Sequence, residues 1–372
     1  MKENPLKKLE TFGQSIWLDY IRRDLIESGE LKRLIEDDGL RWMTSNPSIF
    51  EKAIAESNIY NQTIDYLALN NKNVKEIYES LSQQDVQNAA DEFRTIFDKT
   101  DGEDGYVSIE VNPHLAYDSK STIEEARRLW AALSRSNILI KVPATIEGLS
   151  AIRQLISEGI NVNVTLLFGL PRYRQVAEAY IAGLEERASR GKSLKYIASV
   201  ASFFLGRIDT LVDPLVEKFI NPLGKQSEIA KKIHGQVAIS SAKEAYQIYK
   251  EIFGSKRFKI LADKGARVQR LLWASTSTKN PDYSDIKYIE AIIGPDTVNT
   301  VPLKTIDAYR DHGNPGSRLE SNVEEADWIM AHLPELKINI DIITQQLEDE
   351  GVRKFNEPFD KLMEAISKKT SL

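Results

Sequence analysis

The stretch VSIEVN at residues 107–112 decides the fold of this 372-residue chain. Polar side chains occupy every second position, at Ser108, Glu110 and Asn112, and valine or isoleucine fills the positions between them. Successive side chains of a strand point to opposite faces, so the segment is predicted to be a strand with one polar and one apolar face. The apolar face would meet covering helices, and the polar face would line an enclosed lumen.

A second segment, INVNVTLLF at 160–168, shows the same alternation, with polar side chains at Asn161, Asn163 and Thr165. Six more apolar or alternating segments complete a set of eight candidate strands: SIWLD at 15–19, LRWMTS at 40–45, NILIKVPA at 137–144, YIASVASFF at 196–204, RLLWAST at 270–276 and DTVNTVP at 296–302. Most stretches between them repeat apolar residues at spacings of three and four, which is typical of helices. An open doubly wound sheet gives a similar alternation, but the polar strand faces favour a closed (β/α)8 TIM barrel.

The length of the chain fits one large domain or two ordinary ones. We expect a single barrel domain over residues 1–372, because the strand-helix unit continues through most of the chain. Residues from about 46 to 105 have the pattern of helices between the second and third strands, and they are predicted to be an insertion. Extra helices packed on the barrel are expected from about 317 to 372.

Composition excludes several classes of protein and site. The net charge of −6, without a long basic run, argues against nucleic acid as a partner. The absence of cysteine excludes disulfides, thiolate metal sites and cysteine nucleophiles. No uninterrupted apolar segment approaches the roughly 18 residues needed to cross a membrane, and the first residues lack a secretory apolar core. We therefore expect a soluble, cytoplasmic protein that does not bind membranes.

Metal and nucleotide sites find little support in the sequence. The four histidines, His114, His234, His312 and His332, lack the spacing of metal ligands. Neither a GxGxxG fingerprint nor a P-loop pattern is present. We therefore predict no metal ion and no cofactor.

Lys141 interrupts the apolar strand ILIKVPAT at 138–145. Desolvating an ammonium group is costly, so this lysine needs a partner or a chemical role. A buried ion pair with Glu110 on the neighbouring predicted strand is one explanation. The other is a nucleophile that forms a Schiff base with a carbonyl substrate. At an ordinary pKa of about 10.4 only about one lysine in 2,500 is uncharged at pH 7, and a pKa near 7 would raise that fraction roughly a thousandfold.

Five short motifs resemble the transaldolase family, in the same order along the chain: TSNPSIF at 44–50, VSIEVNP at 107–113, ILIKVPAT at 138–145, GINVNVTLLF at 159–168 and ASFFLGRID at 201–209. SIWLDYIRRD at 15–24 and RLLWASTSTKNP at 270–281 look like its longer bacterial branch. The resemblance implies a (β/α)8 barrel that moves a dihydroxyacetone unit from a ketose phosphate to an aldose phosphate through a lysine Schiff base, without metal or organic cofactor. Sedoheptulose 7-phosphate or fructose 6-phosphate would be the donor, in the non-oxidative pentose phosphate pathway.

The resemblance assigns catalytic roles to four residues. Lys141 would form the imine, and Asp19 would exchange a proton with the C4 hydroxyl during cleavage of the carbon-carbon bond. Glu110 and Thr165 would hold a water for proton transfer during imine formation. Without the family, Asp19 also fits a helix cap or a turn, and Thr165 an ordinary strand position.

The resemblance also places the dihydroxyacetone part of the substrate against Asn46, Asn163 and Ser202. Their amides and hydroxyl can bind its alcohols without adding charge. Phe204 would form an apolar wall beside them. The residues alone leave two alternatives, because Asn46 fits a turn before Pro47 and Phe204 fits the core.

Phosphate binding needs fixed cations. Arg207 in LGRID matches the family's arginine for this task, and the alternative from the residues alone is a salt bridge to Asp209 or to a neighbouring helix. The better-known branch carries a serine and an arginine two residues apart after the seventh strand, where this chain has Ser277 and Lys279. Lysine cannot make a bidentate fork and Ser275 competes for the serine role, so this pair stays open.

Two other functions stay open at this point. A fructose 6-phosphate aldolase would release dihydroxyacetone instead of transferring it. A noncatalytic barrel that binds sugar phosphates would use Lys141 only as the partner of Glu110.

Overall fold

Eight parallel strands form a closed barrel in the computed structural model, which describes residues 4–220 and 224–370. The strands follow one another around the barrel in chain order, and β1 pairs with both β2 and β8. Their bounds are Gln14–Asp19 for β1, Leu40–Thr44 for β2, Val107–Glu110 for β3, Ile138–Pro143 for β4, Val162–Leu167 for β5, Ser199–Phe204 for β6, Arg270–Ala274 for β7 and Thr297–Val301 for β8. The predicted (β/α)8 barrel is therefore confirmed.

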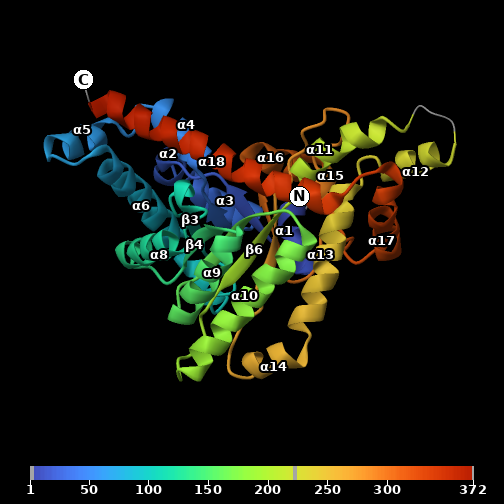
Figure 1. Cartoon of the computed structure of the whole chain (residues 1–372). Helices are drawn as coiled ribbons and strands as arrows, with labels where there is room; N and C mark the ends of the chain where they lie inside the picture. Colours follow the sequence, from blue (N-terminus) through green and yellow to red (C-terminus); the bar gives the residue numbers. More distant parts are fainter. Residues whose placement is uncertain (1–3, 221–223, 371–372) are drawn as a thin grey trace.

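Helices surround the barrel and connect its strands (Figure 1). The chain begins with α1 (Pro5–Lys8) and η1 (Leu9–Phe12). The connections after β1, β3, β4 and β5 contain α2 (Arg23–Glu27), α3 (Glu30–Asp38), η2 (Pro113–Leu115), α8 (Ser119–Leu133), α9 (Ile146–Glu158) and α10 (Leu170–Ser189). The segments after β6, β7 and β8 contain α11 (Gly206–Glu217), α12 (Lys225–Ile233), α13 (Val237–Phe253), α14 (Lys256–Ala262), α15 (Lys287–Ala291) and α16 (Leu303–His312). These helices supply the crossovers that parallel pairing requires.

Strands β3 and β4 show how the two faces of the barrel wall are used. Val107 and Ile109 join the large apolar core that includes the surrounding helices. On the opposite face, Ser108 accepts a hydrogen bond from a side chain of β5, and Glu110 pairs with Lys141 on β4. The alternation in the sequence therefore separates a helix-covered face from a polar inner face, as predicted.

Two polar residues at strand ends differ from the expected lining of the lumen. The side chain of Asn112 accepts a hydrogen bond from the amide of His114 (3.0 Å) and caps η2. Asn161 donates to the carbonyl of Ile138 (3.2 Å) and accepts from the amide of Ala198 (2.9 Å), at the amino end of the sheet. Both side chains form hydrogen bonds with backbone groups at the end of a strand. The alternating pattern therefore predicted one more polar residue in the lumen than is found, on β3 (Asn112) and on β5 (Asn161) alike.

Aromatic residues fill the lumen near the amino ends of the strands. The rings of Trp17 and Trp42 stack with centroids 3.8 Å apart, and Tyr106 lies 4.3 Å from Trp42. With Leu139 and Val298 these rings form an apolar cluster of their own, separate from the outer core. This cluster separates the polar groups at the amino ends from those at the carboxyl ends of the strands, where (β/α)8 enzymes carry their active sites.

The segment between β2 and β3 contains four helices, α4 (Pro47–Ala55), α5 (Asn61–Leu69), α6 (Val74–Glu92) and α7 (Arg94–Lys99). A buried polar network docks them on the connection after β1. Arg23 Nε lies 3.0 Å from Asp85 Oδ1 on α6, and the hydroxyl of Tyr60 donates to Asp85 Oδ2 (2.8 Å). Because removing one partner would leave a buried charge, this network fixes where the helices sit on the barrel.

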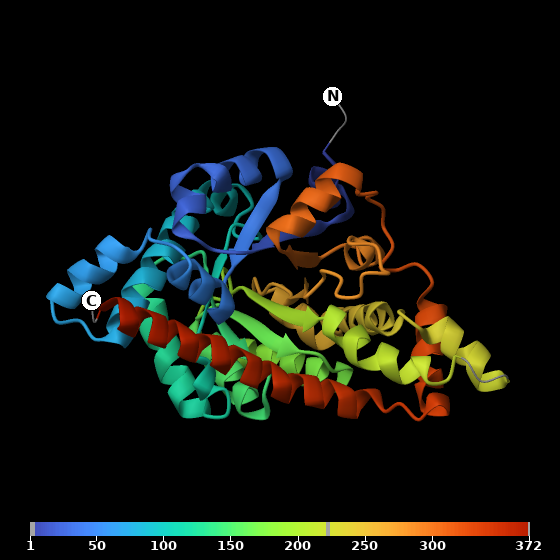
Figure 2. The same cartoon turned by 90° about the horizontal axis from the view of Figure 1, so that it is seen from above.

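The chain ends in α17 (Val323–His332), η3 (Leu333–Leu336) and the long helix α18 (Ile340–Thr370), while residues 371 and 372 lie outside the described residues. α18, drawn in red, runs along the side of the barrel on which α4 and α11 also lie, and it contacts both helices and β5 (Figures 1 and 2). Polar contacts hold it at three places: Arg172 Nε with Glu348 Oε2 (3.0 Å), His114 Nε2 with Asp360 Oδ1 (2.7 Å) and Lys369 Nζ with Asn61 Oδ1 (2.7 Å). None of the helices in residues 4–220 and 224–370 is both long and apolar enough to cross a membrane.

Candidate active site

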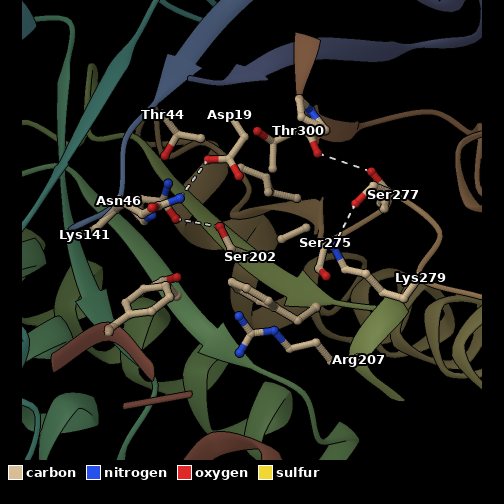
Figure 3. Close-up of a pocket in the computed structure, with 18 residues that line it drawn as sticks. Asp19, Thr44, Asn46, Lys141, Ser202, Arg207, Ser275, Ser277, Lys279 and Thr300 are labelled. Carbon is tan, nitrogen blue, oxygen red and sulfur yellow. Dashed lines mark hydrogen bonds between the residues drawn. The ribbon is translucent and has the colours of Figure 1, made fainter. Parts of the chain in front are cut away.

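A cavity of about 280 Å³ opens at the carboxyl ends of the strands (Figure 3). The structure brings ten of the eleven site residues predicted from the sequence to its wall: Asp19, Asn46, Lys141, Asn163, Thr165, Ser202, Phe204, Arg207, Ser277 and Lys279. The eleventh, Glu110, lines a smaller cavity that shares Lys141 and Thr165 with the first. These eleven residues come from the strands β1 to β7 or from the segments that follow them, and they meet in one place.

Lys141 lies at the centre of this wall, between Glu110 on β3 and Asn163 on β5, its partners in the strand register. Its Nζ is 2.5 Å from Glu110 Oε1 and donates a hydrogen bond to the carbonyl of Ser45 (2.9 Å). The ion pair considered for this lysine is therefore present. It does not remove the lysine from the lumen, because Lys141 borders both cavities.

Glu110 carries a carboxyl in an environment that disfavours its charge. Burial raises its pKa, the charge of Lys141 opposes that rise, and the charge of Asp19 adds to it. Although Lys141 is close, neither oxygen of Glu110 has a partner in hydrogen-bonding geometry within the described part of the chain, and the hydroxyl of Thr165 has none there either. The cavity of about 20 Å³ beside these three residues has room for about one water.

Asp19 ends β1 and faces the same cavity. Burial raises the pKa of its carboxyl, and Lys141, Asn46 and Lys279 oppose the rise. Asn46 Nδ2 donates to Asp19 Oδ1 at 3.4 Å, as the dashed line in Figure 3 marks. The helix-cap alternative for Asp19 is wrong, because α2 begins after Arg22 and has no side-chain cap.

Asn46 lies both at the start of a helix and in the wall of the cavity. Its side-chain oxygen accepts from the amide of Ile49 (3.1 Å), which makes it the N-cap of α4, directly before Pro47. Its side-chain nitrogen is directed toward Asp19 in the cavity. The helix thus fixes the amide, and the amide still presents a donor to the site.

A chain of hydrogen bonds orients the polar groups on the neighbouring strands. Ser202 Oγ on β6 donates to Asn163 Oδ1 (2.7 Å), and Asn163 Nδ2 donates to Ser108 Oγ (3.0 Å). Phe204, two residues after Ser202, packs its ring 5.2 Å from that of Phe168 and forms an apolar part of the wall. The site therefore has a polar side on β5 and β6 next to an apolar one.

Arg207, in the first turn of α11, points its guanidinium into the cavity (Figure 3). The expected alternative, a salt bridge to Asp209, is wrong. Asp209 instead accepts from the hydroxyl of Tyr288 (2.8 Å) and the amide of Ala238 (2.8 Å), and Lys287 lies 3.6 Å away. Nη1 of Arg207 is buried and has no hydrogen-bond partner among residues 4–220 and 224–370, so this cation can receive an anionic ligand.

The loop after β7 adds a second cation. Lys279 Nζ donates to Ser277 Oγ (3.3 Å), and both line the cavity together with Ser275. Ser275 has a left-handed backbone (φ 55), and its carbonyl accepts from the amide of Gly206 at 2.9 Å. A Cβ at Gly206 would come within 2.7 Å of that carbonyl, so glycine allows the loop to lie close to the start of α11 and to Arg207.

Sequence reasoning missed several residues of the wall, among them Thr44, Thr300 and Phe355. The hydroxyl of Thr300 is buried and has no hydrogen-bond partner in the residues that the structure describes. Thr44 and Thr300 are at or next to the carboxyl ends of predicted strands, a position that marks barrel active sites and could have identified them. Phe355 comes from α18, and the sequence gives no sign that this helix reaches the site.

The histidines form pairs elsewhere: His114 with Asp360, His234 with Glu217 and His312 with Asp285. Within the described parts of the chain, 4–220 and 224–370, no three histidine, aspartate or glutamate side chains gather so that they could hold a metal ion.

The fold and the site define the class of protein: a (β/α)8 barrel with a lysine among carboxyl groups in its lumen and two cations at its mouth. Residues 16–366 match the model of the Transaldolase/Fructose-6-phosphate aldolase family. The chain is 50% identical to the transaldolase of Trichodesmium erythraeum over 99% of this chain and 98% of that protein. It is 47% identical to transaldolase 2 of Nostoc punctiforme (99% and 98%) and 44% identical to the transaldolase of Thiobacillus denitrificans (98% and 99%). The chain belongs to this family of enzymes, and the family resemblance is confirmed.

Proposed function

We propose that this enzyme is a transaldolase that transfers a dihydroxyacetone unit from sedoheptulose 7-phosphate or fructose 6-phosphate to an aldose phosphate, through a Schiff base on Lys141. The observation that carries the proposal is the position of Lys141. Its amine lies 2.5 Å from Glu110 and borders the cavity that also holds the unpaired Arg207. Nucleophile, base and anion-binding group are thus within reach of one sugar phosphate.

Imine formation starts with proton transfer from the Lys141 ammonium to Glu110. A carboxylate whose pKa is raised by burial is a stronger base than an exposed one. The neutral amine attacks C2 of the ketose, and the C2 oxygen takes up a proton. A water in the small cavity, held by Glu110 and Thr165, relays protons until the C2 oxygen leaves as water and the protonated imine remains.

Cleavage then uses Asp19. Its carboxylate accepts the proton of the C4 hydroxyl, the bond between C3 and C4 breaks, and the electron pair passes to C3 as an enamine while the iminium nitrogen loses its positive charge. The aldose phosphate leaves with its new aldehyde. An acceptor aldehyde takes its place, and the same steps run in reverse to form the new ketose phosphate.

Binding divides between the two sides of the cavity. The amides of Asn46 and Asn163 and the hydroxyl of Ser202 would hold the alcohols of the three-carbon unit. Arg207 would bind the phosphate through its planar fork, with Lys279 as a second cation whose partner is Ser277 or Ser275.

A fructose 6-phosphate aldolase is the second candidate, because the family name covers both activities. The names of the relatives favour transaldolase. Consumption of fructose 6-phosphate with and without an acceptor aldehyde separates the two activities. A donor-only rate equal to the full rate would contradict transaldolase.

Borohydride trapping tests the Schiff base directly. Incubation with fructose 6-phosphate and borohydride is expected to leave a reduced three-carbon adduct on Lys141, located by peptide mass spectrometry. Lys264→Ala is the control, because that lysine lies outside the cavity and its adduct yield should stay normal. An intact enzyme that binds the sugar but forms no adduct would be a noncatalytic sugar-phosphate barrel.

The same proposal includes a cytoplasmic location, no contact with nucleic acid and a single domain over residues 1–372. These expectations follow from the composition and the continuous strand-helix pattern.

A further inference from the structure

Helix α18 passes over the ends of β3, β4 and β5, and its middle part reaches the reacting groups. Val352 and Phe355 line the small cavity beside Glu110, Lys141 and Thr165. Phe355 also lines the large cavity, so its half-buried ring borders both spaces, as Lys141 and Thr165 do. The centroid of that ring lies 6.0 Å from Lys141 Nζ.

The helix is held closely against the strand that carries Thr165. A Cβ at Gly351 would come within 3.0 Å of a methyl group of Leu166, so the glycine allows a tight approach. Leu166 follows Thr165 at an irregular point of the β5–β6 register and has a left-handed backbone (φ 56). Polar contacts at Glu348 and Asp360 fix the helix on both sides of Phe355.

The proposed reaction requires that the enamine intermediate be protected from water, and the position of Phe355 fits this requirement. After cleavage, C3 of the enamine is a carbanion equivalent that either attacks the acceptor aldehyde or takes a proton from water. Protonation at C3 returns an iminium ion, a water then adds to C2, the C2–N bond breaks, and dihydroxyacetone leaves while Lys141 regains its amine. A transferase must therefore keep water from C3 until the acceptor arrives.

We propose that Phe355 determines whether this enzyme transfers or releases the three-carbon unit, by sealing the imine from bulk water. An apolar ring has no proton to donate. Because the ring borders both cavities, it would narrow the path from bulk solvent to C3, while the water beside Glu110 keeps its access to C2 along Lys141 and Thr165. The ring also lies at the outer limit of a cation–π contact with the iminium nitrogen, about 6 Å. This inference rests on the proposed Schiff-base function.

Two substitutions at this position form a graded series. Phe355→Leu keeps an apolar side chain and opens a small gap, and Phe355→Ala opens a large one. We expect the ratio of donor-only consumption of fructose 6-phosphate to transfer onto erythrose 4-phosphate to rise in the order wild type, Leu, Ala, by about tenfold for Ala. In D2O the released dihydroxyacetone should carry deuterium at the carbon that was C3.

Phe359→Leu is the matched control. This residue is one turn further along α18 and packs on Tyr78 and His114 instead of lining either cavity. Its substitution should disturb the helix and leave the ratio unchanged.

Three results would overturn the inference: an unchanged ratio in both Phe355 variants, a fall of both rates in parallel, or an equal rise in Phe359→Leu. If Phe355→Ala does not fold, the comparison of wild type with Phe355→Leu decides. Borohydride trapping of the same samples distinguishes failure of the role of Phe355 from failure of the Schiff-base function. An adduct on Lys141 in every variant with an unchanged ratio rejects the role of Phe355 alone, whereas no adduct in the wild type rejects the proposed function.

Discussion

The two ends of the barrel both contain a cavity, and the larger one is not the candidate active site. The cavity at the amino ends measures about 360 Å³, against about 280 Å³ at the carboxyl ends. At the amino end Asp104 pairs with Arg270 (3.0 Å) and accepts hydrogen bonds from Ser15 and Trp42. At the carboxyl end Arg207 forms no salt bridge among the described residues and has a buried nitrogen without a partner.

The difference in charge pairing between the two ends shows which features distinguish an active site from a structural cluster. An ion pair whose carboxylate also accepts hydrogen bonds from its neighbours, as at Asp104, stabilises the fold. Buried groups with shifted pKa values and no hydrogen-bond partner among the described residues, as at Glu110 and Arg207, can act on a ligand. The apolar cluster around Trp17 and Trp42 separates the two ends. Substitutions should therefore affect catalysis at one end and stability at the other.

The largest effect is expected at Lys141. Lys141→Ala removes the nucleophile, so kcat/KM should fall on the order of 10⁴-fold or more, and the borohydride adduct should disappear. Circular dichroism should show an intact fold, because Glu110 can become protonated when its ionic partner is lost. Activity above a tenth of the wild-type value would disprove the assignment of the nucleophile.

Asp19→Asn should have the next largest effect. Loss of the base for the C4 hydroxyl should lower kcat by about 10²–10⁴-fold, while an adduct with dihydroxyacetone still forms because imine chemistry does not need this carboxyl. If trapping and kcat were lost together, Asp19 would belong to the imine step instead.

The pH dependence of the same pair adds a second measurement. The pKa of Asp19 is raised by burial, so wild-type activity should fall on acidification at a pH above the ordinary aspartate value of about 3.9. A carboxyl with a raised pKa favours the folded state when protonated and opposes folding once the pH exceeds that pKa. At pH 7 Asp19→Asn should therefore be at least as stable as the wild type in urea unfolding. A less stable variant would contradict a pKa of Asp19 that is raised by burial.

Arg207→Ala tests whether the cation at the carboxyl end, without an ionic partner in the described part of the chain, binds phosphate. Because charge-assisted hydrogen bonds contribute about 1.5–3 kcal/mol, kcat/KM for fructose 6-phosphate should fall by about 10–100-fold, mostly through KM. Lys279→Ala should cost less, since its ammonium is exposed and cannot form a fork. Equal activity toward fructose 6-phosphate in wild type and Arg207→Ala would exclude a phosphate contact at Arg207.

Much of this arrangement can be predicted from the sequence, because local rules determine it. The alternation at Ser108 and Glu110 predicts the inner face of the barrel, and the cost of burying an ammonium in an apolar strand singles out Lys141. The sequence could not decide whether Arg207 pairs with Asp209 or faces the cavity. The hydrogen-bond partners that occupy Asp209 come from α13 and α15, later in the chain, and only folding brings them to it. Phe355 could not be predicted, because its place follows from how α18 packs across the barrel.

The smallest effect on activity is expected at the amino end. Asp104→Ala breaks a mostly buried ion pair and leaves Arg270 without its partner, so unfolding in urea should show a loss of about 3 kcal/mol, with kcat/KM within about twofold of the wild type. The double variant Asp104→Ala with Arg270→Met removes both charges and should recover part of that stability. A folded Asp104→Ala enzyme with kcat/KM more than tenfold lower would show that the apolar cluster transmits changes between the two ends. In that case the aromatic rings at Trp17 and Trp42, two residues before Asp19 and Thr44, would belong to the support of the active site as well as to the core.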